Sequence, residues 1–403
     1  MSWSLVHCKV NPSSSNSAKA PAVEVLKVTQ YIHMGPFLNL QPRVLWRNLM
    51  GMVLPYSVLK RSLLFLCFII LGSCHENNLK EKYTTLFAGN AMTIDYRVII
   101  GKKLTSQEAE SVKEAISEIF ESINTTFNNW NPNSELSKLN QLKSNVTVPI
   151  SLELNAVLKQ TDDIVNLTNG LFDPTMEPLH KLWKEHLEKG EIPTTAQIKN
   201  ISLAIGWNKI HLIGQNFYKS DDRTAIDLGG IVKGHCVDLL IEKLNELGFP
   251  DVLVEWGGEI RTTGAHPEGR PWTVFVSGLG SLNPDKAIAK IEMNDLALAT
   301  SGDYLQNWTV IENEHEITYF HIINPLLKRP LRTTEDSIAS ASVATTTCAL
   351  ADAIATTLML FPTLNEAKQW VKGIQPGAPL RCWIATRKKS EYVETSSQAI
   401  EHK

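Results

Sequence analysis

The chain has 403 residues, of which 43% are hydrophobic, and it carries a formal net charge of −3 at pH 7. These values are typical of a globular protein with a large core, and the length alone would allow two or three domains. No block dense in lysine and arginine stands out among the mixed charges, which argues against a nucleic-acid-binding protein.

The N-terminal part carries an export pattern. A Lys-Arg pair at positions 60 and 61 precedes a short apolar run over 63–71, which ends in Leu71-Gly72-Ser73-Cys74. The run is shorter than the about 20 residues that a membrane-spanning helix needs, and its end resembles a bacterial lipobox. We expect an over-long N-terminal extension over 1–51, a lipoprotein signal peptide over 52–73 and a polar tether over 74–84. Cys74 would be lipid-anchored on the periplasmic side, with the inner membrane favoured over the outer. An ordinary buried element is the alternative.

The first part of the body combines strands with a capped helix. Residues 86–100 alternate apolar and polar side chains, which predicts strands, and Met92 lies within them. Thr105 and Glu108 form a capping box, so a helix should begin there and end near the Asn-rich loop that contains Trp130. A tryptophan in such a polar loop is unusual unless it packs on something flat.

A second helix, expected over 152–167, leads into a bend at Leu171-Phe172-Asp173-Pro174-Thr175. Pro174 restricts the residue before it to an extended conformation and so exposes backbone beside Phe172. In the plainer interpretation, Phe172 is a core residue and Asp173 caps a helix over 176–187.

The segment over 225–238 indicates a corner that binds polyphosphate and metal. Asp227 ends an apolar run, Gly229-Gly230 allows backbone to approach a ligand, and a helix is predicted over 231–247. Backbone N–H groups at a helix start attract phosphate, and Lys233 can meet it as a point charge. The alternative is a plain tight turn followed by a solvated lysine.

Two further segments add to this corner. A second glycine pair lies at 257–258, and Asp352 and Thr356 stand four residues apart on a predicted helix, so their oxygens share one face. Such oxygens are the ligands that Mg²⁺ prefers. Strands are expected at 251–255, 272–276 and 297–300. Helices and strands alternate irregularly, which predicts one α+β domain over 85–390. Its mixed or antiparallel sheets would be flanked by helices with a ligand cleft between them, and a disordered polar tail would follow over 391–403.

Six motifs together resemble one family, the periplasmic FAD:protein FMN transferases of the ApbE type. They run in the family's order from about residue 86 to about 384: Gly170–Thr175 with Pro178-Leu179, Asp227–Gly234, Gly257-Gly258 with Gly264 and Pro271-Trp272, Ala299–Tyr304, His321–Pro325, and Ala351-Asp352 through Thr356.

The resemblance implies an activity and its participants. The family transfers FMN from FAD to a Thr or Ser hydroxyl of a membrane flavoprotein subunit and releases AMP. A Na⁺-translocating NADH:quinone reductase type of acceptor is one example. FAD is therefore the expected substrate and Mg²⁺ the expected cofactor, with Mn²⁺ as an alternative. An Mg²⁺-dependent FAD pyrophosphatase that yields FMN and AMP, and a periplasmic FAD-binding protein without catalysis, remain alternative readings.

The resemblance also assigns site residues. Asp352, Thr356 and the backbone carbonyls of Gly230 and Ala349 would hold the metal. His321 would accept the proton of the acceptor hydroxyl, with Asp303 as the fallback, and transfer would fall as the pH drops through about 6.5. Lys233 would offset charge on the leaving phosphate. The FAD contacts would be Met92, Trp130, Leu171, Phe172, Asp173, Asp227, Lys233 and Ile323. The chain departs from the family's pattern in lacking a glycine after Met92 and in carrying Asn324 in place of an aspartate.

Overall fold

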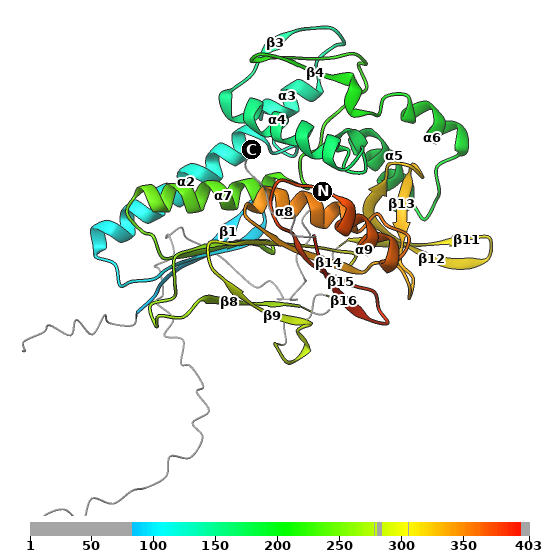
Figure 1. The fold of residues 1–403 in the computed structure, drawn as a ribbon. Helices are drawn as coiled ribbons and strands as arrows, with labels where there is room; N and C mark the ends of the chain where they lie inside the picture. Colours follow the sequence, from blue (N-terminus) through cyan, green and yellow to red (C-terminus); the bar gives the residue numbers. More distant parts are fainter. Residues whose placement is uncertain (1–82, 278, 280–283, 305, 396–403) are drawn as a thin grey trace, which may run out of the picture. The chain divides into compact units, whose positions relative to one another are not determined.

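An eight-stranded sheet organises the part of the chain that the computed structural model describes, residues 83–277, 279, 284–304 and 306–395 (Figure 1). Its order follows the chain: β1 (Thr85–Ala91), β2 (Ile94–Ile100), β6 (Val252–Trp256), β7 (Glu259–Thr263), β10 (Ala297–Gly302), β14 (Ser340–Thr345), β15 (Arg381–Ala385) and β16 (Ser390–Glu394). Every neighbouring pair is antiparallel. The α+β prediction is therefore confirmed, and the sheet pairings among the described residues are antiparallel rather than mixed.

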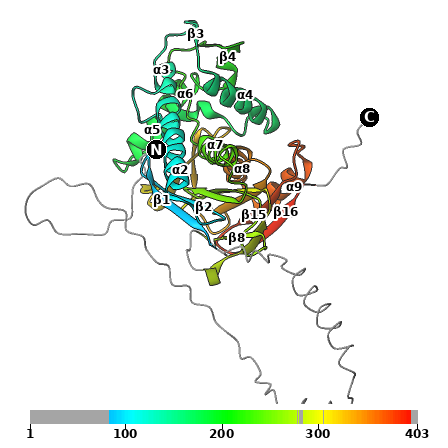
Figure 2. The same cartoon turned by 90° about the vertical axis from the view of Figure 1, so that its left-hand side faces the viewer.

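Helices cover one face of this sheet and a strand pair covers the other (Figures 1 and 2). The helices are α2 (Ser106–Thr126), α7 (Val232–Glu246), α8 (Cys348–Leu358) and α9 (Leu364–Gly373). On the opposite face, β8 (Trp272–Val276) and β9 (Ala289–Met293) pack their apolar side chains against Leu253 and Leu298 of the sheet. Burial on both faces explains why β14 has no exposed residue.

The remaining described elements lie outside the eight-stranded sheet. The helices are α3 (Glu135–Asn140), α4 (Leu152–Leu167), η1 (Pro174–Met176), α5 (Glu177–Leu187), α6 (Thr195–Ser202), η2 (Trp207–Lys209) and η3 (Pro284–Lys286). One small sheet has the order β3 (Val148–Pro149), β5 (Asn216–Lys219), β4 (Ile210–Ile213). The other has the order β11 (Asn307–Glu312), β12 (His315–Asn324), β13 (Arg329–Arg332). Among these elements, η1, α5 and β12 contribute to a pocket. An apolar cluster joins α5 and α6 to β11 and β12.

The local signals for helices are confirmed. Thr105 and Glu108 form the predicted capping box of α2, and α4 has the predicted bounds. The expectation of a disordered tail is wrong at its start, because β16 pairs with β15 along its whole length and buries Val393. The signal peptide, Cys74 and the extension before them lie outside the described residues. No described helix combines the length and the apolar character needed to cross a bilayer.

Helices α7 and α8 cap each other's N-termini. Neither has a side-chain bond from its own N-cap residue. Asp352 of α8 accepts a hydrogen bond from the N–H of Gly234 in α7 at 3.2 Å, and Asp238 of α7 accepts from the N–H groups of Cys348 and Ala349 in α8 at 2.8 and 3.0 Å. Buried N–H groups at a helix start need such partners. The exchange therefore fixes Asp352 and the start of α7 relative to each other.

Replacing Gly234 with alanine is expected to destabilise the fold, because a Cβ there would lie 2.2 Å from the carbonyl oxygen of Cys348. Overpacking of this kind costs about 1 to 3 kcal/mol. Thermal or urea unfolding followed by circular dichroism measures the loss. Gly373→Ala is the matched control, since a Cβ there meets nothing within 4 Å. Equal stability of the two variants would contradict close contact between α7 and α8.

Candidate active site

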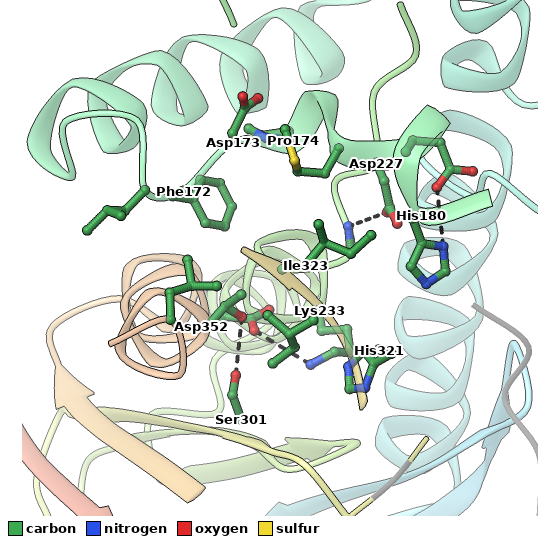
Figure 3. A pocket seen from close by; sticks show the side chains of 18 of the residues that line it. Phe172, Asp173, Pro174, His180, Asp227, Lys233, Ser301, His321, Ile323 and Asp352 are labelled. Carbon is green, nitrogen blue, oxygen red and sulfur yellow. Dashed lines mark hydrogen bonds and ion pairs between the residues drawn. The ribbon is translucent and has the colours of Figure 1, made fainter. Parts of the chain in front are cut away.

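A single pocket collects most of the residues that the sequence motifs single out (Figure 3). It opens to solvent, and its lining combines apolar side chains with a small set of polar groups, as ligand pockets do. One part of its wall is apolar and is formed by Leu171, Phe172, Pro174, Met176, Ile322, Ile323 and Leu360. The other part is polar and is formed by Asp173, Glu177, His180, Asp227, Lys233, Thr300, Ser301, His321, Asp352 and Thr356, with Gly229, Gly230, Gly257 and Gly302 between them.

The loop that carries Asp227 is held by buried polar groups. Lys219 is only 1% exposed, and its ammonium donates to the carbonyls of Asn140, Asp222 and Thr224 at 2.7, 3.1 and 2.7 Å. Asn140 also binds both the N–H and the carbonyl of Ile226, at 2.7 and 2.8 Å. Buried polar groups that are satisfied in this way fix a single loop conformation. The loop therefore delivers Asp227 to the pocket without needing a ligand.

The bend before α5 packs closely against the glycine turn. Asp227 donates its N–H to the carbonyl of Pro174 at 2.8 Å. A Cβ on Gly230 would lie 3.1 Å from the ring of Phe172 and 3.4 Å from the hydroxyl of Thr356, so a glycine allows this approach. Asp173 caps η1 by accepting from the N–H of Thr175 at 2.9 Å, and it also lines the pocket. The capping interpretation and the pocket interpretation of Asp173 are thus compatible.

Lys233 lies between two buried carboxylates. Its ammonium forms an ion pair with Glu259, which has no exposed surface, and lies 3.6 Å from Oδ1 of Asp352. Burial alone would lower the pKa of Lys233, but the charges of Asp352 and Glu259 outweigh it and leave this pKa above its ordinary value. Burial raises the pKa of both Glu259 and Asp352, and the lysine opposes that rise. Lys233 therefore stays charged and faces the pocket.

Hard oxygen donors converge beside this lysine. Asp352 and Thr356 lie one turn apart on α8, the hydroxyl of Thr356 is 3.2 Å from that of Ser301, and the backbone of Gly230 faces Thr356. Carboxylate, hydroxyl and carbonyl oxygens fit Mg²⁺. The described residues contain no cluster of three or more His, Cys, Asp or Glu side chains arranged to hold a metal ion. Mg²⁺ sites with few protein ligands are completed by waters or by phosphate oxygens of a ligand.

His321 lies on β12 with its ring in the pocket wall. Its Nδ1 is buried and has no hydrogen-bond partner among the described residues. Burial lowers the pKa of the imidazole to about 4, while a hydrogen bond to the backbone of Gln306 opposes the shift. The ring is thus neutral and able to accept a proton at pH 7. The expectation that it protonates near pH 6.5 is wrong for the free protein, because the buried site disfavours the charged form.

Most of the predicted site residues meet in the pocket, but four do not line it. Met92 occupies the tight turn between β1 and β2 with a φ of 48°, and it packs against the main core. Trp130 is 53% exposed, with the ammonium of Lys184 5.2 Å from its ring centre. Asp303 is 1% exposed and binds Arg387 through both oxygens, so its carboxylate is not available as a proton acceptor in the pocket. Ala349 is buried in the first turn of α8. Their assigned roles stay predictions that the geometry of the pocket does not support.

The sequence patterns gave no role to five polar residues near Lys233 or in the pocket wall. Glu177, His180, Thr300 and Ser301 line the pocket, and Glu259 forms an ion pair with Lys233. Thr300 and Ser301 belong to the Ala299–Tyr304 motif, and Glu259 directly follows the glycine pair at 257–258. Glu177 and His180 follow the Pro174 bend at helical spacing, and a buried helix face that carries two titratable groups is the signal that could have identified them.

The fold and pocket define an α+β protein whose described part holds a pocket lined by strands and helices. A model of the ApbE family matches residues 91–379. An FAD:protein FMN transferase of Chlamydia pneumoniae is 39% identical over 310 residues, covering 76% of this chain and 93% of the relative. That of Vibrio cholerae is 28% identical over 294 residues, covering 72% and 84%. The solved flavin transferase ApbE from Vibrio cholerae superposes with a TM-score of 0.65 at 25% identity, covering 78% of this chain and 98% of that structure. The chain belongs to the ApbE family.

Proposed function

We propose that this protein is an FAD:protein FMN transferase that moves FMN from FAD to a Thr or Ser hydroxyl of a membrane flavoprotein subunit and releases AMP. One observation carries the proposal most directly. A single pocket combines an apolar wall around Phe172, a charged Lys233 beside Asp352, and a neutral buried His321. The relatives named as FAD:protein FMN transferases support the same reading.

The residues of the pocket have separate roles in the reaction. The apolar wall holds flat rings, and the glycine turn at 229–230 lets backbone approach the pyrophosphate. Lys233 offsets negative charge on the leaving phosphate. Nδ1 of His321 takes the proton of the acceptor hydroxyl while the hydroxyl oxygen attacks the flavin-side phosphorus.

We also propose a dependence on Mg²⁺, or on Mn²⁺ in its place, because the donor set fits. Asp352, Thr356 and the carbonyl of Gly230 would hold the ion, and Ser301 lies beside them. When bound, such an ion supplies Lewis-acid polarisation and charge neutralisation at phosphate oxygens.

The decisive experiment mixes the protein with FAD, Mg²⁺ and a candidate acceptor subunit and then looks for flavin fluorescence on the acceptor in a denaturing gel. A covalent fluorescent band that disappears without FAD supports the transferase. If FAD alone yields FMN and AMP at equal rates and no acceptor becomes labelled, the protein hydrolyses FAD instead. FAD bound without any turnover would indicate a binding protein.

The proposed location rests on the N-terminal pattern. We propose that the mature chain begins at Cys74 and carries lipid there, on the periplasmic side of the membrane, because the basic pair, short apolar run and lipobox occur in order. Intact-mass analysis of membrane-extracted protein should show acyl chains on Cys74. A Cys74→Ala variant should be released from the membrane fraction. A wild-type chain with an unmodified Cys74 would refute the anchor.

A further inference from the structure

Helix α5 contributes a carboxylate and an imidazole to the pocket wall that have no role in the mechanism above. Glu177 and His180 lie one turn apart at the start of α5, and both line the pocket. Nδ1 of His180 is 3.9 Å from one oxygen of Glu177, and the ammonium of Lys181 is 3.1 Å from the other. The two side chains are only 12% and 10% exposed. A buried carboxylate behind an imidazole is the arrangement that supports proton transfer.

His180 has a free nitrogen in this pocket. Its Nε2 is buried and has no hydrogen-bond partner among the described residues. Figure 3 shows His180 and Asp227 close together, with His321 on the same side of the pocket. The charge of Asp227 acts on both His180 and Glu177. The proposed function places Lys233, which lines the same pocket, at the leaving phosphate, so Nε2 of His180 shares the pocket with the leaving nucleotide.

The environments of these groups separate their proton affinities. Burial raises the pKa of Glu177 to about 7, with the charge of Asp227 adding to the rise and Lys181 opposing it. Burial lowers the pKa of His180 and of His321 to about 4. Glu177 therefore keeps its proton closer to neutral pH than the two imidazoles do, and groups whose pKa values are pushed apart can serve as proton donor and acceptor. The proposed function already uses His321 as the base, and an acid for the leaving group is missing.

We propose that His180 is the general acid for the departing AMP and that Glu177 is the positioning residue that acts through it. The inference rests on the proposed function. The acceptor oxygen forms a bond to the flavin-side phosphorus while its proton goes to His321. The bond from that phosphorus to the AMP oxygen breaks, and its electron pair leaves with AMP. Nε2–H of His180 protonates that oxygen, and the carboxyl of protonated Glu177 returns a proton to Nδ1. The 3.9 Å separation between Glu177 and His180 belongs to the free protein, and such contacts commonly shorten when substrate binds.

The proposal predicts a defined pH dependence. Transfer by the wild type should fall as the pH rises through about 7, because Glu177 then loses the proton that it supplies. The charged and titratable groups around the pair are Lys181 and Lys184 on the same helix, Asp227 from the loop before α7, and His321 on β12. Glu177 itself, with its pKa raised to about 7, is the group that we expect to titrate in this window.

The test compares single-turnover FMN transfer, pH profiles and FAD binding for three variants. His180→Gln should slow transfer by about 10² to 10⁴, the usual contribution of general acid catalysis, without changing FAD affinity. Glu177→Gln should be slower than the wild type and should lose the decline above pH 7. His186→Gln, on the same helix and bonded to the carbonyl of Leu182, is the control and should behave as the wild type. Circular dichroism confirms that each variant folds.

Each outcome bears on one of two claims. If the wild type binds FAD but labels no acceptor, the proposed function fails. If the wild type transfers FMN and His180→Gln transfers at the same rate, only the acid role fails. It also fails if Glu177→Gln keeps the decline above pH 7, or if FAD affinity falls in step with the rate. If His180→Gln does not fold, the pH profile of Glu177→Gln decides alone.

Discussion

Replacing Asp352 with asparagine is expected to abolish FMN transfer while FAD still binds. The change removes a charged oxygen from the proposed Mg²⁺ site, and losing such a ligand costs several kcal/mol of transition-state stabilisation, which is about 10³-fold in rate. FAD should remain bound, because Phe172 and Ile323 belong to the apolar part of the pocket wall, which the substitution leaves unchanged. Fluorescence titration of FAD and the gel assay for transfer measure the two effects separately.

The Asp352 variant should also fold. Asparagine keeps an oxygen that can accept from the N–H of Gly234, and Lys233 keeps Glu259 as its partner, so no buried charge is left unpaired. Asp336→Asn is the control, since that carboxylate is 80% exposed and pairs with Lys388 on the surface, away from the pocket lining. Unchanged turnover of Asp352→Asn in saturating Mg²⁺ would remove Asp352 from the site.

Replacing His321 with alanine is expected to slow FMN transfer by about 10² to 10⁴, the usual contribution of a general base. FAD affinity should barely change, because a base acts mainly in the transition state. The low-pH limb of the wild-type profile should lie near 4, since burial lowers the pKa of this imidazole to about 4 and it loses its accepting nitrogen only below that value. The variant should lack this limb and keep the decline above pH 7 that we assign to Glu177.

His315→Ala provides the matched control for this experiment. His315 lies on the same strand, is exposed, and its Nδ1 is hydrogen-bonded to the backbone carbonyl of Asn313. The His315→Ala variant should transfer FMN at the wild-type rate. Parallel losses of rate and FAD binding in His321→Ala would show that His321 is a structural residue.

The long helices, the strands β1, β2, β6 and β10 and most of the pocket could be predicted from the sequence because local chemistry encodes them. A capping box marks the start of α2, and the Asp352 and Thr356 spacing places two oxygens on one helix face. The family resemblance then added His321. What these motifs could not give is which neighbours surround each group. The shift of the His321 pKa and the pairing of Lys233 with Glu259 depend on burial between segments far apart in the chain.

The misplaced residues have a related explanation. Met92 and Trp130 were assigned by motif position, and neither carries a local signal for the direction of its side chain. In the structure, Met92 and Thr93 form the two-residue turn of the β1–β2 hairpin, and both have positive φ. This conformation shapes the hairpin and does not bring Met92 into the pocket wall. Asp303 follows β10 directly, but its carboxylate is held by Arg387, a residue 84 positions later in the chain. A partner so far away in the sequence cannot be recognised from the motif.

The strictly sequential order of the eight-stranded sheet has a consequence for how the chain is made. A ribosome or a translocation channel delivers a polypeptide from its N-terminus, and here each new strand finds its partner at an edge that already exists. No strand has to insert between two that are already paired, and β16 closes the series last. The β1–β2 hairpin can form as soon as residue 100 emerges, and growth then proceeds in one direction. The strands are therefore synthesised in the order in which they pair. The pocket needs both α5 and α8, so it is completed only after α8 has been synthesised.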